Sequence, residues 1–157
     1  MKNTPAKSKA GVVKYYTENS PKAPVLKEPS ALADYSPGTL LKELRKGLPF
    51  AELEALQSSL AVPLEKLAGF LGISKATLHR RRASGRLDIA ESDRVVRYAR
   101  LMGLATQVLE SPENARLWLS MPKKGLGGAI PLEYAETEFG AREVEDLLGR
   151  IEYGVYS

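Results

Sequence analysis

The chain of 157 residues is 43% hydrophobic and 27% charged, so it is long enough to bury one ordinary core or two small helical units. It has no cysteine and a single histidine, which argues against cysteine nucleophiles, disulfides and Cys/His metal sites. No apolar run approaches the roughly 20 residues that a membrane span needs, and no apolar block follows the N-terminal lysines. We therefore expect a cytoplasmic protein that uses no metal, cofactor or small-molecule substrate.

The net charge of +4 is distributed unevenly along the chain. Residues 1–30 contain six lysines and two glutamates. Residues 72–100 contain eight basic and three acidic side chains, whereas residues 132–157 contain seven acidic and two basic ones. A polyanion is therefore expected to bind the middle of the chain and to be repelled by its C-terminal part.

Residues 1–35 are predicted to form a flexible basic arm. The stretch combines several prolines with scattered lysines and shows little periodic apolarity, a composition typical of mobile segments. Val12, Val13, Tyr15 and Tyr16 are the exception, and they could dock on a partner or on the folded body. If the stretch is a flexible arm, we expect that residues 1–30 can be deleted without loss of folding.

From Thr39 onward the apolar residues recur at helical spacing, and no alternating run is long enough for a convincing strand, so the pattern predicts an all-α fold. Four helices are expected before residue 83, because glycine, proline and serine recur where helices end or begin. Their boundaries are set by Gly47, Pro49, Pro63, Gly72, Ser74 and Arg82.

Four further helices are expected in the second half. A long helix from about Asp88 to Leu109 carries an apolar seam, formed by Val95, Ala99, Met102, Thr106 and Leu109. A helix opened by Pro112 places Trp118 in the core. After a glycine-rich loop, one helix is predicted from Pro131 to Gly140 and the last from about Ala141 to Tyr153, where Gly154 stops it.

Residues 64–82 have the spacing of a helix-turn-helix. Ala68 is small where two helices would cross closely, and Gly72 can take the left-handed conformation of the tight turn. Ile73 and Leu78 supply the apolar contacts that hold the second helix against the first. One position departs from the motif, because Arg81 stands where an aliphatic residue is usual. We expect either different packing at the end of the second helix or an Arg81 side chain that turns to solvent.

In this motif the N-terminal part of the second helix enters the major groove of DNA. The residues expected to face DNA are Ser74, Lys75, Ala76, His79, Arg80, Arg81 and Arg82. Arg80 is suited to a guanine edge and Ala76 to a thymine methyl group. Lys75 and the Arg81–Arg82 pair are suited to phosphates. The alternative is an ordinary αα-corner with a solvated basic face.

Three C-terminal stretches, residues 111–120, 125–132 and 140–154, resemble the toxin-binding domain of the Xre/MbcA/ParS antitoxin family. The resemblance covers roughly residues 60–157, and residues 1–50 contribute nothing to it. It implies the antitoxin of a type II toxin–antitoxin pair, whose partner is a RES-domain toxin that destroys NAD. It also implies that the C-terminal part covers the toxin's active-site cleft, that the protein forms dimers, and that it represses its own operon.

The last helix and the residues after it are the predicted toxin-binding segment. The residues assigned to it are Arg150, Tyr153, Gly154, Val155, Tyr156 and Ser157. The two tyrosines offer large apolar area with a polar tip, which suits interface anchors. An acidic helix end with a terminal carboxylate would satisfy the groups that hold a pyrophosphate in an NAD-binding toxin. In the alternative, Tyr153 folds onto its own domain and Tyr156 frays.

The glycine-rich loop is predicted to be a packing turn rather than a phosphate-binding loop. Gly125, Gly127 and Gly128 match neither nucleotide-binding fingerprint, and no strand precedes them. The chain also offers no nucleophile and base that could be paired, so we predict neither catalytic residues nor an enzyme.

The predicted organisation is therefore a flexible arm at residues 1–35, a DNA-binding unit at 36–86 and a dimerisation and toxin-binding domain at 87–157. The predicted partners are a RES-domain toxin, an inverted-repeat operator and a second copy of the chain, with no membrane contact. Two other functions remain open. A stand-alone helix-turn-helix regulator would use the last third only for dimerisation, and an adaptor protein would have lost DNA contact.

Overall fold

The structure is a computed structural model that describes residues 36–152 and Gly154. The predicted arm at residues 1–35 and the tail residues Tyr153, Val155, Tyr156 and Ser157 lie outside the described residues. The elements in chain order are α2 (Pro37–Lys46), α3 (Phe50–Leu60), α4 (Leu64–Phe70), α5 (Lys75–Ser84), α6 (Ile89–Leu109), α7 (Pro112–Leu119), the 3-10 helix η2 (Lys124–Leu126), α8 (Pro131–Tyr134) and α9 (Glu138–Glu152). The described residues contain no strand, which confirms the all-α prediction.

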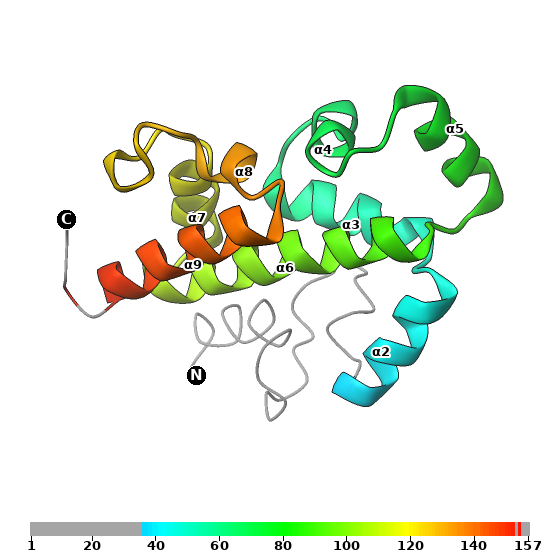
Figure 1. The fold of residues 1–157 in the computed structure, drawn as a ribbon, viewed down its shortest axis with the longest axis horizontal. Coiled ribbons are helices and arrows are strands. Elements are labelled where there is room, and N and C mark those ends of the chain that lie inside the picture. Colours follow the sequence, from blue (N-terminus) through cyan, green and yellow to red (C-terminus); the bar gives the residue numbers. More distant parts are fainter. Residues whose placement is uncertain (1–35, 153, 155–157) are drawn as a thin grey trace, which may run out of the picture.

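Helix α6 is the spine of the molecule (Figure 1). Helices α2 and α3 pack against its N-terminal part, and α7 and α9 pack against its C-terminal part. Its start is fixed by a capping box, in which the Asp88 side chain accepts the Glu91 amide and the Glu91 side chain accepts the Asp88 amide. The predicted seam is confirmed, since Val95, Ala99, Met102 and Thr106 are buried. Leu109 is partly buried.

The segment that contains α4 and α5 is tied to the rest of the fold at its end. The Leu87 amide donates to the Leu48 carbonyl at 2.9 Å, and the Phe50 amide donates to the Gly85 carbonyl at 2.9 Å. The Leu48 amide donates in turn to the Ser92 hydroxyl of α6 at 2.7 Å, and this bond is buried. These contacts hold the helix-turn-helix segment between α3 and the start of α6.

The single helix predicted from Pro131 to Gly140 is wrong. Helix α8 ends at Tyr134, the chain turns, and α9 begins at Glu138, earlier than predicted. The Thr137 hydroxyl accepts the Gly140 amide at 3.0 Å, which caps the new helix. Gly140 permits a close crossing rather than stopping a helix, because a Cβ there would lie 1.8 Å from the Tyr134 carbonyl oxygen.

The glycine-rich loop is a packing turn, as predicted. Leu126 is buried, and a Cβ at Gly125 would lie 2.8 Å from a methyl group of Leu147 on α9. The prediction that Trp118 belongs to the core is corrected, because it is only partly buried and packs at the edge of the core. The Lys123 ammonium lies 5.0 Å from the centroid of its ring. Burial lowers the pKa of that ammonium group.

We expect Gly140→Ala to destabilise the fold by about 1–3 kcal/mol, because the added methyl group overlaps the Tyr134 carbonyl and the crossing of α8 and α9 must open. Gly69→Ala is the matched control. A Cβ at Gly69, on the exposed side of α4, meets nothing within 4 Å, so the change is expected to be neutral or stabilising by up to about 1 kcal/mol. Urea unfolding measures both, and equal stability of the two variants would contradict the close crossing.

Candidate nucleic-acid and partner interfaces

Helices α4 and α5 and the turn between them have the predicted helix-turn-helix geometry. Ala68 is buried where the helices meet, and the Ile73 amide donates to its carbonyl at 2.8 Å. Gly72 takes a positive φ of 70°, the left-handed conformation that glycine adopts without strain. Leu78 is the buried residue of α5 and holds that helix against the core. The turn therefore forms for the reasons that the sequence indicated.

The N-terminal part of α5 presents polar and basic side chains to solvent at one end of the molecule (Figure 1, right). Ser74 caps the helix, since its hydroxyl accepts the Thr77 amide at 3.2 Å. The predicted DNA-facing residues Lys75, Ala76, His79 and Arg80 are all exposed. The face that the motif would offer to a major groove is thus uncovered by any element that the structure describes.

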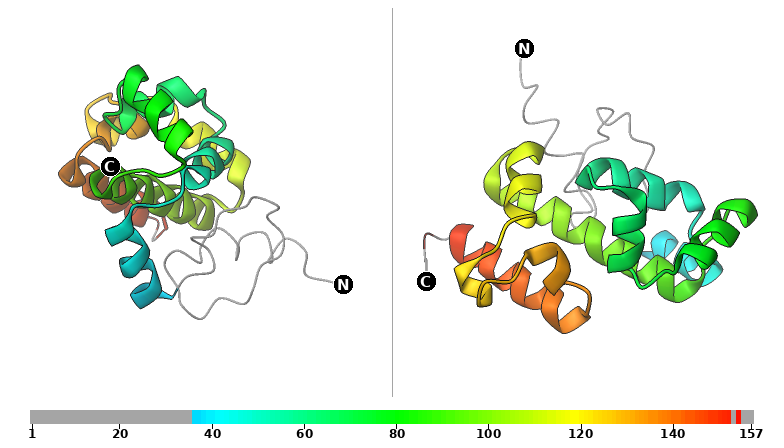
Figure 2. Two further views of the ribbon diagram at one scale, coloured as in Figure 1. Left: turned by 90° about the vertical axis from the view of Figure 1, so that its right-hand side faces the viewer. Right: turned by 90° about the horizontal axis from the view of Figure 1, so that it is seen from above.

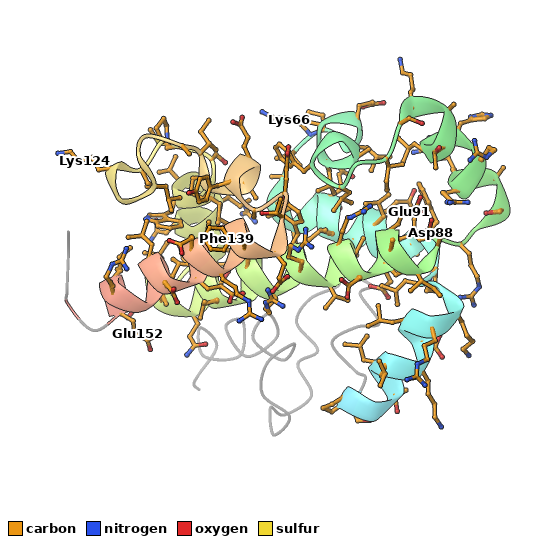
Figure 3. The ribbon with its side chains drawn as sticks, viewed as in Figure 1. Lys66, Asp88, Glu91, Lys124, Phe139 and Glu152 are labelled. Atoms are coloured by element: carbon orange, nitrogen blue, oxygen red, sulfur yellow. The ribbon has the colours of Figure 1, made fainter. Side chains whose placement is uncertain are left out.

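Arg81 is placed differently from the predicted phosphate contact. Its Nε donates to Glu91 Oε1 at 2.7 Å, and its Nη2 donates to Glu91 Oε2 at 3.1 Å and to Asp88 Oδ2 at 3.2 Å. Asp88 and Glu91 lie at the start of α6 (Figure 3). The hydrogen bond to Glu91 is the main reason that the pKa of Arg81 is raised. Of the two outcomes left open for the unusual arginine, the structure shows different packing, because an ion pair replaces the aliphatic contact.

Arg82 is exposed and lies over Phe50 of α3 rather than against the start of α6. Its guanidinium carbon is 5.5 Å from the centroid of the Phe50 ring, a cation–π distance. Such a contact restrains the side chain but leaves its hydrogen-bond donors accessible to an anion. Arg82 thus stays a candidate phosphate contact, whereas the guanidinium of Arg81 is held by carboxylates.

Most of the basic residues counted between residues 72 and 100 bind groups inside the chain. Arg86 donates to the Gly47 carbonyl, and Arg94 donates to the Leu71 carbonyl at 3.1 Å, at the end of α4. Arg97 and Arg100 reach across to carboxylates on α9. The charge count therefore overstated the surface available to DNA. The basic side chains that remain exposed on α5 are Lys75, Arg80 and Arg82.

An ion-pair network joins the middle of α6 to α9. Glu138 accepts from Arg97 Nε at 3.2 Å and from Arg100 Nη2 at 3.1 Å, and Arg100 Nε donates to Glu145 at 2.5 Å. Burial opposes the ionisation of Glu138, but the two arginines outweigh it and lower the pKa of this carboxyl group. Beside the network, the buried Tyr98 hydroxyl donates to the Leu132 carbonyl at 2.8 Å. These contacts attach the C-terminal helices firmly to the spine.

The predicted toxin-binding segment is described only in part. Arg150 is partly buried, and its Nε is buried without a hydrogen-bond partner among the described residues. Gly154 takes a positive φ of 77°, and its amide donates to the Ile151 carbonyl at 3.1 Å, as expected for the end of a helix. Tyr153, Val155, Tyr156 and Ser157 lie outside the described residues. Their assignment to the toxin stays a prediction.

Comparison with known proteins identifies both parts of the chain. Residues 39–100 match the Antitoxin Xre-like helix-turn-helix domain, and residues 104–154 match the Antitoxin Xre/MbcA/ParS C-terminal toxin-binding domain. A relative from Yersinia enterocolitica named Antitoxin Xre is 35% identical over 125 residues, which are 78% of this chain and 84% of the relative. The chain belongs to the Xre/MbcA/ParS antitoxin family. It is an antitoxin of a toxin–antitoxin system with a helix-turn-helix domain.

Two further relatives of this antitoxin agree. A Photorhabdus laumondii protein named Antitoxin Xre is 31% identical over 73% of this chain and 78% of its own length. A Sphingobium protein named Prs ADP-ribosylating antitoxin is 26% identical over 81% of this chain and 86% of its own length. The match to a toxin-binding domain favours an antitoxin over a stand-alone regulator that uses its last third only to dimerise.

Helix α6 contributes to both matched regions, which meet between Arg100 and Leu104. The predicted boundary at residues 86 and 87 stays a prediction, and the spine is shared on either side of it. Within the described residues, no group of three or more His, Asp or Glu side chains could hold a metal ion. None of the described helices has both the length and the apolarity to cross a membrane.

The pairing of Arg81 with Glu91 gives a testable consequence. We expect Arg81→Met to lower the melting temperature of the antitoxin by several degrees, because it leaves the Glu91 carboxylate, 8% exposed, without its guanidinium partner. Adding Glu91→Gln should recover part of the loss, since a neutral amide costs less to bury and can still complete the capping box. Arg80→Met, on the exposed face, is the control. Equal melting temperatures for Arg81→Met and Arg80→Met would contradict the assignment.

Proposed function

We propose that this antitoxin binds an inverted-repeat operator through α5, represses its own operon, and inhibits a RES-domain toxin that degrades NAD. The observation that carries the proposal is the separation of two surfaces along α6 (Figure 1). The exposed basic face of α5 lies beyond its N-terminal end, and α9 packs against its C-terminal half. One chain can therefore hold DNA and a protein partner at the same time.

Operator recognition is assigned to the exposed residues of α5. Arg80 reads a guanine edge through its forked donors, and Ala76 contacts a thymine methyl group. Lys75 and Arg82 neutralise phosphates, and the capped N-terminus at Ser74 favours a further phosphate. His79 lies on the same exposed face. Arg81 is left out of this set, because it positions α5 on α6 through Glu91.

Toxin inhibition is assigned to the C-terminal end. Arg150 and the segment from Tyr153 to Ser157 cover the NAD-binding cleft of the toxin, with the tyrosines as apolar anchors. The acidic C-terminal end of α9 complements the cationic groups that a toxin uses to bind a pyrophosphate. The match of residues 104–154 to a toxin-binding domain supports this assignment. The name of the Sphingobium relative refers to ADP-ribosylation, a reaction that takes its ADP-ribose from NAD.

We assign the antitoxin to the cytoplasm. We assign it as a homodimer, because an inverted repeat presents two equivalent half-sites that a two-fold symmetric protein can occupy. No catalytic role is assigned to the antitoxin itself. The proposal therefore predicts that operator binding and toxin inhibition can be lost separately, each through changes at its own surface.

Two variants should separate the functions. Arg80→Ala is expected to weaken operator binding by about 1–3 kcal/mol while leaving toxin neutralisation intact, because the lost contact reads a base. Deletion of residues 153–157 is expected to leave operator binding intact and to release the toxin, because the aromatic anchors are removed. Mobility-shift assays measure the first property, and growth and NAD content of cells that also produce the toxin measure the second.

The controls use matched charge changes. Lys75→Ala should weaken operator and unrelated DNA alike, whereas Lys124→Ala, at the opposite end of the molecule (Figure 3), should change neither. Unchanged operator binding by an Arg80→Ala, Lys75→Ala double variant would overturn the role of α5. Full neutralisation by the truncated protein would show that inhibition comes from the body of the C-terminal region.

A further inference from the structure

The outer side of α9 carries a row of residues, most of which are exposed and one of which, Gly149, is partly buried. Phe139, Arg142, Asp146 and Gly149 follow one another at intervals of three and four positions, so they lie along one side of the helix. This row, here called the outer stripe, lies opposite the buried side formed by Ala141, Val144 and Leu148. The Phe139 side chain is 70% exposed and the Arg142 side chain 71% exposed.

Gly149 is the least expected member of the outer stripe. A glycine inside a helix lowers helix stability relative to alanine, and it is normally found where a side chain would collide. Gly140 in the same helix has such a collision, but a Cβ at Gly149 would meet nothing within 4 Å. Among the described residues the space beside Gly149 is therefore open, and it would admit a bulky group from another molecule.

We propose that a second copy of the antitoxin packs against the outer stripe, with the two α9 helices antiparallel. In the register that places Phe139 opposite Gly149 of the second copy, Arg142 lies opposite Asp146 of that copy. Two-fold symmetry makes each contact twice, because the same patch serves both chains. A large aromatic ring then meets the open glycine, and each positive charge meets a negative one.

Two of the acidic residues beside the outer stripe have partners in their own chain. Glu138 and Glu145 flank it, and both carboxylates are already paired with Arg97 or Arg100 of their own chain. Arg142 contacts Glu138 through Nε at 3.4 Å, an exposed i,i+4 pair that contributes little to stability. The two charged members of the outer stripe itself, Arg142 and Asp146, are of opposite sign.

The arrangement of the fold suits an antiparallel pair. Helix α9 lies at one edge of the molecule, and the loop that contains η2 lies beside its C-terminal half (Figure 2, right). Phe139 and Glu152, labelled in Figure 3, mark its beginning and its end. The α5 helix lies beyond the N-terminal end of α9, so antiparallel pairing places the two α5 helices at opposite ends of the dimer. Two half-sites on one duplex are likewise separate from one another.

The complementarity of the outer stripe with itself is the reason for choosing a second copy over the toxin. In one antiparallel register of α9 with itself, Phe139 meets Gly149 and Arg142 meets Asp146. Binding to a toxin would not require the residues of α9 to match one another in this way. The inference rests on the proposed homodimer and names the surface that forms it.

A charge exchange tests the pairing directly. Arg142→Asp and Asp146→Arg should each weaken the dimer by about tenfold or more, because each places like charges opposite one another twice. The double variant should restore the dimer, since every pair is then opposite in charge again. Sedimentation equilibrium over a range of concentrations measures the dissociation constant, and circular dichroism confirms folding. Glu54→Arg, an exposed charge reversal on α3, is the control and should leave the dimer unchanged.

Gly149→Ala and Gly149→Leu provide an independent test, because they act on the helix and on the dimer in opposite directions. Both should raise the helix stability of the monomer, and the larger side chain should weaken the dimer more. A dimer that resists all these single variants, or a double charge variant that stays monomeric, would overturn this interface while leaving the proposed function intact. A wild-type chain that stays monomeric with and without operator DNA would overturn both. Loss of toxin binding without loss of the dimer would assign the outer stripe to the toxin and overturn the inference.

Discussion

The carboxylate of Glu91 joins the DNA-facing part of this antitoxin to the rest of the molecule. It accepts the Asp88 amide, which starts the spine helix α6, and it accepts two donors from Arg81, which lies near the end of α5. A carboxylate so little exposed is stable only while its partners stay in place. The direction of α5 is therefore fixed by a polar contact at one end and by the burial of Leu78 at its middle.

As a consequence, the proposed DNA-binding and toxin-binding surfaces lie at different ends of α6. The arginines near its start and middle bind carbonyl groups and carboxylates of the same chain, which attaches helices to the spine but removes these charges from the surface. Lys75, Arg80 and Arg82 remain exposed on α5. The C-terminal helices are attached by apolar burial and by the pairing of Arg97 and Arg100 with Glu138. Each binding surface can then change without disturbing the other.

The helix spacing, the caps and the turn at Gly72 were predictable, because they depend on residues close together in the sequence. The partner of Arg81 was not, since Glu91 lies ten residues away in a different helix; the departure from the usual aliphatic residue was the only signal. The break between α8 and α9 was not predictable from the position of Gly140 in the sequence. Its role depends on the Tyr134 carbonyl that crosses it, a contact set by tertiary packing. Counting basic residues likewise could not reveal which of them are paired internally.

The central claim is that DNA and toxin bind at opposite ends of one spine. Amide hydrogen exchange measured on the antitoxin alone, with its operator, and with its toxin tests this claim most directly. The account predicts that operator DNA slows exchange in α5, that the toxin slows exchange at the C-terminal end of α9, and that neither effect extends to the other end. Operator DNA that leaves α5 unchanged, or a toxin that protects α5 instead of α9, would contradict it.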